Sequence, residues 1–302
     1  MRSERHRGYA LLVVIWGLGA IAAIVLSFSA TGRFRLQTAF SAANTEQARL
    51  LAAAGTNVAI VRLARERFAS EAPPHNGVPG FCSIEDAALA ISIEDEGGKI
   101  DLNAATEELL RDAFRGLAGL GPAQALAAAR AVVQFRTPAI FGAAAPVAGK
   151  PFRSKGGPFQ TALELDQVAN LGQASVQAIL PFATVYSHVD GLDSRRAPPA
   201  LLAALLGGSR EQIAILAAAP FPNSLNRNDT RFPSAYSRDV AHDVFMVHVE
   251  VRLSNGARGL SETIVDFQAG DGEFYILREV HLGASRFSRE LDTMSVPELP
   301  QC

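Results

Sequence analysis

The sequence predicts an α+β protein in which one long N-terminal helix packs on a small antiparallel sheet, with an all-helical domain inserted between the early and late strands. Three patterns support this prediction. An uncharged apolar stretch continues into an amphipathic helix, two helix-hairpin-helix patterns follow, and the last third alternates apolar and polar residues with a period of two. At 302 residues and 48% hydrophobic, the chain is long enough to bury more than one core.

Residues 9–28 form the predicted membrane anchor. This stretch contains no Asp, Glu, Lys, Arg, Asn or Gln, and as a helix it spans the roughly 30 Å hydrocarbon core of a bilayer. Residues 1–8 hold three arginines against one glutamate, and this positive charge keeps the N-terminus in the cytoplasm. We therefore expect a single-pass protein of a bacterial inner membrane whose bulk is periplasmic.

The alternative is a cleaved signal peptide, with a secreted enzyme released after Ser29 or Ala30. The continuation of the helical pattern favours a retained anchor, because apolar residues recur at steps of mostly three and four from Leu36 onward. These positions are Phe40, Ala43, Leu50, Leu51, Ala54, Val58 and Val61. We predict an amphipathic helix over 29–68, continuous with the anchor apart from a weak point at Gly32, with this stripe against the sheet.

A break rich in proline and glycine over 69–80 ends the predicted helix. Early strands are expected within 81–97, at 88–91 and 92–93. The acidic residues at 94–96 are predicted to form a solvated turn, since their spacing does not fit a calcium-binding EF-hand loop.

The middle of the chain is predicted to form two helix-hairpin-helix, SAM-like units, over 98–187 and 188–235. In the first unit Asn103 is expected to cap a helix that has two glutamates in its first turn. A Gly-Leu-Gly segment breaks this helix before Pro122, which suits the first position of the next one. The second unit repeats the pattern from 197 to 202.

Helix-hairpin-helix elements often hold nucleic-acid phosphates on backbone amides, so the alternative function is a membrane-anchored DNA-binding or DNA-uptake protein. Residues 111–155 carry seven basic side chains against the single acid Asp112. The formal net charge of −2 gives no overall basic excess, and no aromatic stacking partner lies near the hairpin. We therefore expect no nucleic-acid partner.

The segment 236–285 is predicted to supply the late strands, and 286–302 a tail. Apolar residues alternate with polar ones over 245–253, which indicates a half-buried strand. Turns and return strands are expected at 255–256, 263–267, 270–272 and 274–277.

The sequence contains no nucleophile, nucleotide-binding or zinc motif, so we expect no enzyme and no catalytic, cofactor or metal residues. His242 and His248 are expected to face solvent. Turn and cap roles are predicted for Asp190, Asp193, Asp239 and Asp243. Cys82 and Cys302 form a disulfide only if the fold brings them together, which their sequence positions do not decide.

The N-terminal residues around Gly8 and Tyr9 resemble the processing site of type IV pilins and pseudopilins. This resemblance implies that a prepilin peptidase cleaves after Gly8 and that the new amine of Tyr9 is methylated. Most family members carry a glutamate at the fifth position of the processed chain, where this sequence has Val13. That glutamate neutralises the amine of the subunit ahead, since an unpaired charge in a bilayer is costly, so its absence marks a subunit at the tip.

The order of the predicted parts, with segments 95–105, 184–187 and 247–253, resembles the protein K family of type II secretion minor pseudopilins over nearly the whole chain. The resemblance implies a subunit at the tip of the pseudopilus that helps to start assembly and export. The implied partners are the minor pseudopilins I and J and the inner-membrane assembly platform. Family members can bind calcium through acidic loops, but 113–163 contains no Asp or Glu, so we expect no calcium site here.

Overall fold

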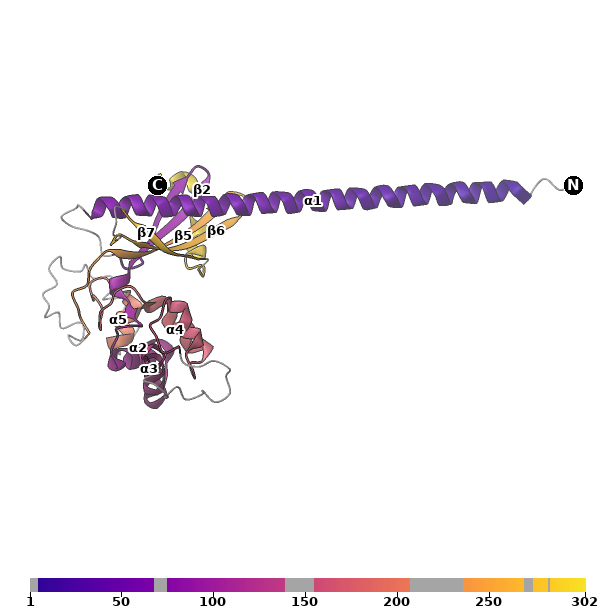
Figure 1. Cartoon of the computed structure of the whole chain (residues 1–302). Helices are drawn as coiled ribbons and strands as arrows, with labels where there is room; N and C mark the ends of the chain where they lie inside the picture. The colour runs from indigo at the N-terminus through magenta and orange to yellow at the C-terminus, as the bar shows by residue number, and fades with distance from the viewer. Residues whose placement is uncertain (1–4, 68–74, 139–154, 207–235, 269–273, 282) are drawn as a thin grey trace.

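The computed structural model describes residues 5–67, 75–138, 155–206, 236–268, 274–281 and 283–302. Helix α1 (Arg5–Glu66) is continuous over 62 residues, and its N-terminal half extends away from the rest of the molecule (Figure 1). Gly32 lies inside this helix and does not interrupt it. The anchor and its continuation thus form one rod, as the sequence predicts.

The sheet contains five antiparallel strands in the order β1-β2-β5-β6-β7. The strands are β1 (Gly80–Ile84), β2 (Ala87–Asp95), β5 (Val244–Leu253), β6 (Arg258–Asp266) and β7 (Ile276–His281). Two early strands therefore extend the predicted late meander, with β2 paired to β5 along its whole length. The inserted helices lie in the connection between β2 and β5, which confirms the predicted α+β architecture.

The strand limits differ from the predicted ones. The two short runs at 88–91 and 92–93 form one strand, β2, which extends through Glu94 and Asp95 because both residues pair with β5. The predicted turn at 255–256 is confirmed, since Gly256 has a φ of +85°. Strand β6 begins earlier than expected and β7 ends later, and the predicted turn at 270–272 lies outside the described residues.

Helix α1 covers one face of the sheet with mostly small residues. Its buried positions are Ala48, Ala52, Gly55, Thr56, Ala59, Ile60 and Leu63. A Cβ added to Gly259 of β6 would lie 2.2 Å from the carbonyl oxygen of Ala48, and one added to Gly55 would lie 2.7 Å from Val249 Cγ1. Glycine is required at both positions because helix and strands approach so closely.

The prediction that the apolar stripe of α1 meets the sheet was wrong. Phe40, Leu50 and Val61 are 67%, 60% and 50% exposed, and Ala43 is also exposed. The other predicted positions, Leu51, Ala54 and Val58, are half-buried at the side of the contact. Small side chains let the helix backbone come closer to the strands than Leu or Phe would. The buried face of α1 is therefore the one with small residues, which packs closely, and not the one with the largest apolar side chains.

The opposite face of the sheet is covered by residues 283–302, here called the C-terminal arm. The arm includes α7 (Ser288–Thr293) and the 3-10 turn η4 (Val296–Glu298). Leu291 packs on Ala88 and Ala90 of β2, and Cys302 forms a disulfide with Cys82 of β1. Strand β5, predicted to be half-buried, is therefore buried on both faces except at Arg252.

The inserted domain forms a second core below the sheet in Figure 1. Its elements are η1 (Glu96–Gly98), β3 (Ile100–Asp101), α2 (Glu107–Ala118), α3 (Pro122–Arg136), η2 (Ala162–Gln167), α4 (Gln173–Ile179), η3 (Leu180–Phe182), β4 (Ala183–Thr184) and α5 (Pro199–Leu206). Strands β3 and β4 pair in parallel, which joins the segment after β2 to the segment after α4.

The helical hairpin α2–α3 is confirmed with one change in its cap. Thr106, and not Asn103, caps α2 by accepting a hydrogen bond from the amide of Leu109 at 3.2 Å. Asn103 instead accepts from the amide of Phe159 at 2.7 Å, because the fold brings that distant segment alongside it. Gly119 takes a left-handed φ of +66° at the break, and Pro122 begins α3.

Helix α5 begins the predicted second unit and packs in the same core as α2. Leu201, Leu202 and Leu205 belong to one hydrophobic cluster with Leu109 and Phe114 of α2. The remainder of the second unit, from residue 207 to 235, lies outside the described residues. The division into two units therefore stays a prediction.

Candidate functional site

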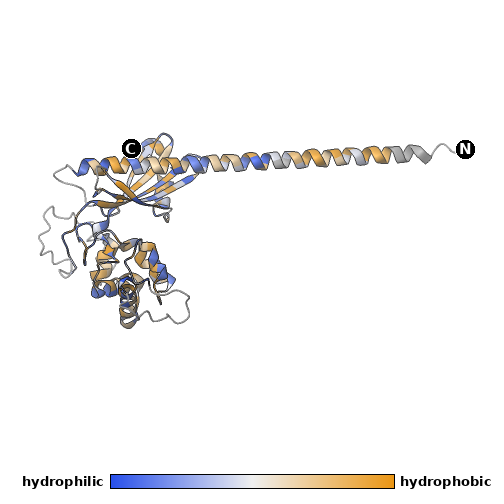
Figure 2. Ribbon diagram, viewed as in Figure 1, coloured by the Kyte–Doolittle hydropathy of each residue, from blue (hydrophilic) through white to orange (hydrophobic). Residues whose placement is uncertain are grey.

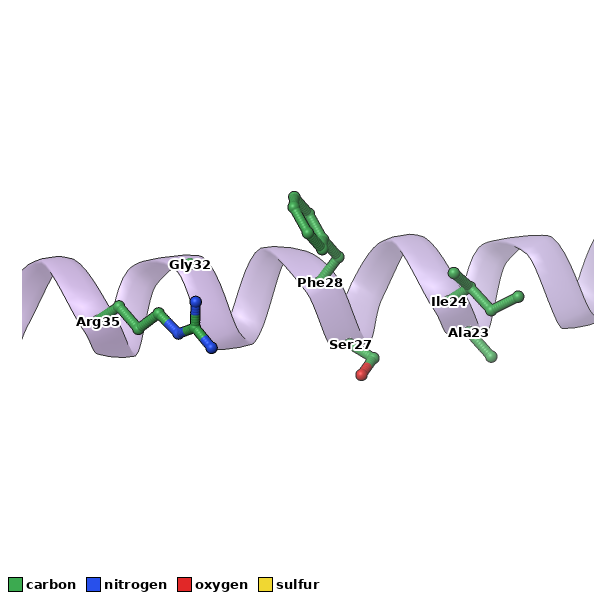
Figure 3. A pocket seen from close by; sticks show the side chains of 6 residues that line it. All are labelled: Ala23, Ile24, Ser27, Phe28, Gly32 and Arg35. Carbon is green, nitrogen blue, oxygen red and sulfur yellow. The ribbon is translucent and has the colours of Figure 1, made fainter.

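The first candidate site is the surface of α1. From Leu11 to Phe28 the helix is exposed on every side, although its residues are mostly apolar (Figure 2). Among the described residues, this helix is the one that is long and apolar enough to cross a membrane. Figure 3 labels six residues of one stretch of α1, with Ile24 and Phe28 projecting outward and Arg35 beyond the apolar stretch.

The processing residues predicted from the sequence lie at the start of this helix. Gly8 and Tyr9 are within α1, and their side chains lie outside the part of the chain that is described in atomic detail. Val13 follows one turn later and is 51% exposed, so it lies on the free surface of the anchor. The structure does not test cleavage, methylation or the role of Val13, and these remain predictions.

The head half of α1 has two apolar faces. One is the small-residue face against the sheet, and the other is the exposed stripe that contains Leu36, Phe40, Leu50 and Val61. Exposed apolar patches on soluble surfaces commonly mark interaction sites. The sequence had found this stripe but had assigned it to the wrong contact.

The second candidate site is a set of buried charges where the sheet meets the inserted domain and the C-terminal arm. We call it the carboxylate–histidine cluster, and its members are Glu94, Glu96, Lys99, His248, Glu250, Glu262, His281 and Arg286. A cavity of about 280 Å³ lies beside it between the sheet and the inserted domain. The cluster joins residues 94–99 at the end of β2 to strands β5, β6 and β7 and to the start of the C-terminal arm.

Lys99 occupies the end of the cluster nearest the inserted domain. Its Nζ lies 2.8 Å from Glu94 Oε2 and 2.7 Å from Glu96 Oε1, and all three residues are buried. Burial by itself lowers the pKa of Lys99, but the two carboxylates outweigh this effect and hold the pKa above its ordinary value. Burial raises the pKa of Glu96. The prediction of a solvated turn at 94–96 was therefore wrong, since Glu94 and Glu96 are partners of a buried lysine and Asp95 is also buried.

His248 lies at the centre of the cluster and was wrongly expected to face solvent. Its ring is completely buried, with Nδ1 2.8 Å from Glu262 and Nε2 2.9 Å from Glu250. The alternation along β5 placed His248 on the polar face, but the C-terminal arm covers that face. The spacing of two residues between His248 and Glu250 shows only that both lie on the same face of β5, and it does not indicate burial.

A second ion-pair group lies nearby and includes His242. Its Nδ1 is 2.8 Å from Asp95 and its Nε2 is 3.3 Å from Asp193, so the prediction that His242 faces solvent was wrong. Burial by itself lowers the pKa of His242, but the hydrogen bonds to Asp193 and Asp95 raise it to about 9. Arg196 adds a further contact to Asp95 at 3.3 Å. Asp193 is thus a buried partner as well as a turn residue.

The other three aspartates also accept from arginines. Asp190 pairs with Arg238, Asp239 with Arg195 and Asp243 with Arg67. These ion pairs join segments that are distant in the sequence. The predicted turn and cap roles of the aspartates therefore did not include their arginine partners.

Several basic residues that suggested the DNA-binding alternative form ion pairs or hydrogen bonds within the inserted domain. Arg130 pairs with Glu107 at 3.1 Å, Lys155 with Glu164 at 2.7 Å, and Arg136 donates to two backbone carbonyls. Residues 150 and 153 lie outside the described part of the chain. Arg130, Arg136 and Lys155, three of the five described basic side chains in 111–155, are therefore engaged within the inserted domain, and the absence of a nucleic-acid partner stays a prediction.

The expectation that this chain has no calcium site stays a prediction. No group of three or more Asp, Glu, His or Cys side chains there has an arrangement that would hold a metal ion. The acidic run at 94–96 does not fit a hard cation, because Lys99, Arg286 and His242 already occupy its carboxylate oxygens.

No protein-family model matches the sequence, and no curated protein matches it. The structure is similar to a chain in the crystal structure of the GspK-GspI-GspJ complex from the type 2 secretion system of enterotoxigenic Escherichia coli. The match has a TM-score of 0.58 and 13% sequence identity, and it covers 84% of this chain and 100% of the other. The chain therefore shares the α+β fold of a chain in this complex, which agrees with the fold that the sequence resemblance implies.

Proposed function

We propose that this protein is a minor pseudopilin that occupies the tip of a type II secretion pseudopilus and helps to start its assembly. The observation that carries the proposal is the construction of α1. From Leu11 to Phe28 the helix carries no charge and is exposed on every side, and its C-terminal half keeps an exposed apolar stripe after the sheet has been covered. Such a rod is suited first to a bilayer and then to packing among the helices of a filament. This role is structural and involves no catalysis.

The proposed location is the bacterial inner membrane, with the N-terminus cytoplasmic and the folded head periplasmic. The apolar stretch and the arginines before it support this orientation. The disulfide between Cys82 and Cys302 is consistent with an oxidising compartment such as the periplasm. A prepilin peptidase is proposed to cleave after Gly8 and to leave a methylated Tyr9.

The tip position is proposed on electrostatic and steric grounds. Val13 replaces the carboxylate that would neutralise the amine of a subunit ahead, and a tip subunit has no such neighbour. The inserted domain adds bulk beside the sheet that would hinder stacking under another subunit (Figure 1). The partners proposed are the counterparts of GspI and GspJ, together with the assembly platform.

The position at which the N-terminus is cleaved distinguishes the proposed pseudopilin from a secreted protein that is released by signal-peptide removal. Mass spectrometry of the full chain is expected to find an N-methylated Tyr9 as the first residue in cells that contain the prepilin peptidase. Cells without the peptidase should retain residues 1–8. A mature protein that begins near Ser29 would show that the anchor is removed, and the filament role would then be wrong.

The exposed stripe gives a second prediction. Leu50→Asp is expected to leave the head folded, because Leu50 is 60% exposed, but to weaken co-purification with the I and J minor pseudopilins at least about tenfold. Charge on this stripe would oppose packing against an apolar helix face. Ala53→Asp is the matched control, since Ala53 is also exposed on α1 but lies off the stripe. Equal losses from both variants would contradict a specific role for the stripe.

A further inference from the structure

Two arginines follow the apolar stretch of α1. Arg33 and Arg35 are exposed, and among the described residues neither has an ion-pair partner. Arg49, which lies farther along the same helix, pairs with Glu46 at 3.1 Å. The guanidinium groups of Arg33 and Arg35 are therefore available to an anionic ligand from outside the chain.

The position of this pair on α1 matches the thickness of a bilayer. Residues 9–32 carry no charged side chain, and as a helix they are about 36 Å long. The hydrocarbon core of a bilayer is about 30 Å thick, and the headgroup regions bring the total to about 40–45 Å. With residues 9–28 across the core, as proposed, Arg33 and Arg35 follow directly at the level of the periplasmic headgroups.

The direction of the two side chains also fits this level. Side chains of an α-helix lean toward its N-terminus, which is on the cytoplasmic side in the proposed orientation. Both arginines therefore lean back toward the bilayer, and Figure 3 shows Arg35 extended along α1 toward Gly32. Because Arg33 and Arg35 are two positions apart, they project about 200° apart around the helix. They would contact headgroups on opposite sides of the anchor.

Phosphate is the headgroup ligand that fits an arginine best. A guanidinium is planar, stays charged, and donates two parallel hydrogen bonds to phosphate oxygens. The ring of Phe28, which precedes the pair, is 82% exposed and suits the acyl-chain side of the same boundary. A charged arginine inside the hydrocarbon is costly, so the pair also opposes sliding of α1 farther into the bilayer.

We propose that Arg33 and Arg35 bind lipid phosphate groups at the periplasmic surface of the inner membrane and thereby fix the depth of α1 in the bilayer. This inference rests on the membrane anchor of the proposed function. Ala48, where contact with the sheet begins, follows Arg35 by about 20 Å of helix, so the head is held at this height above the phosphates. The exposed side chains of Leu36 and Phe40 then lie outside the bilayer, where another pseudopilin can contact them.

Trp16 reports the depth of the anchor without a label, because it is the single tryptophan of the chain and is 77% exposed on α1. It lies about 25 Å along the helix from Arg33, which places it within about 5 Å of the bilayer midplane. The full chain is to be reconstituted in vesicles of phosphatidylethanolamine and phosphatidylglycerol. Tryptophan quenching by lipids brominated at defined acyl positions then measures the depth, and bromines nearest the midplane should quench most strongly.

The Arg33→Gln/Arg35→Gln variant is expected to move Trp16 toward the cytoplasmic face by at least about 5 Å, which is one helical turn. The uncharged part of α1 then extends to Thr45, so apolar residues beyond the pair can enter the hydrocarbon. Both arginines are exposed and lie before the contact with the sheet, so the head should fold as in the unmodified protein.

Arg49→Gln/Arg62→Gln is the matched control, since it removes two exposed arginines from the same helix outside the anchor. It should leave the depth of Trp16 unchanged. The same depth in both double variants would overturn the inference and leave the proposed anchor standing. If no brominated lipid quenches Trp16, the helix does not enter the bilayer, and both the anchor and the inference are wrong.

Vesicles of digalactosyl diacylglycerol test the ligand itself, because this lipid has acyl chains but no phosphate. Charge excludes arginine from the hydrocarbon of either lipid, whereas charge-assisted hydrogen bonds to phosphate form only in the phospholipid. We expect the difference in Trp16 depth between the unmodified protein and Arg33→Gln/Arg35→Gln to fall at least about twofold in the glycolipid. An equal difference in the two lipids would show that exclusion alone sets the depth, and phosphate binding would be wrong.

Discussion

Replacing Cys302 with Ser is expected to lower the free energy of unfolding by about 5 kcal/mol. The disulfide to Cys82 joins residues separated by 220 positions, and the entropy removed from the unfolded chain grows with the length of the closed loop. The bond also ends the C-terminal arm, which covers one face of the sheet. Urea unfolding followed by near-ultraviolet circular dichroism measures the change, with the anchor kept in micelles.

The double variant Cys82→Ser/Cys302→Ser is the control for the disulfide prediction. It should lose no more stability than Cys302→Ser alone, because one bond is removed in both cases. Adding a reductant to the unmodified protein should give a similar loss. If Cys302→Ser unfolds at the same urea concentration as the oxidised protein, the bond has little influence on the unfolded state, and this account of its effect is wrong.

Gly259→Val is expected to lower the free energy of unfolding by more than about 4 kcal/mol, or to prevent the sheet from folding against α1. The buried backbone contact at this position cannot relax around the new side chain. A Cβ at this position would lie 2.2 Å from the carbonyl oxygen of Ala48 and 2.4 Å from its carbonyl carbon. Both are backbone atoms of α1, so the helix itself would have to move away from β6. Denaturant unfolding, or the yield of folded protein, measures the effect.

Gly157→Val is the matched control for this substitution. A Cβ at Gly157 would have no neighbouring atom within 4 Å, so the same chemical change is made in open space. We expect the free energy of unfolding of this variant to stay within about 1 kcal/mol of that of the unmodified protein. Equal effects of the two valines would mean that the close approach of α1 to the sheet contributes little to stability.

The elements predicted correctly depend on neighbours in the sequence. The continuous helix α1, the α2–α3 hairpin with Pro122 at the start of α3, and the turn at Gly256 all follow from residues that are near neighbours in the sequence. The α+β order of the chain follows from the same periodicities. These interactions form over short loops, so the local sequence determines them.

The candidate sites were harder to predict because their groups are distant in sequence. Glu94 meets Arg286 across a separation of 192 residues, and Asp95 meets His242 across 147. Each charged residue alone is consistent with a solvated surface, which is the commoner environment for acids and histidines. The burial that changes their chemistry comes from the C-terminal arm and the inserted domain.

By itself, the sequence determined that α1 is one long helix, that residues 9–28 within it carry no charge, and that alternating strands follow near the C-terminus. Only the tertiary structure decided which face of α1 meets the sheet, that Cys82 meets Cys302, and that His248 is buried between two glutamates. The physical reason is the range of the interactions. Helix and strand periodicity are set by hydrogen bonds and contacts between near neighbours, whereas close packing and charge pairing depend on which distant surfaces the folded chain brings together.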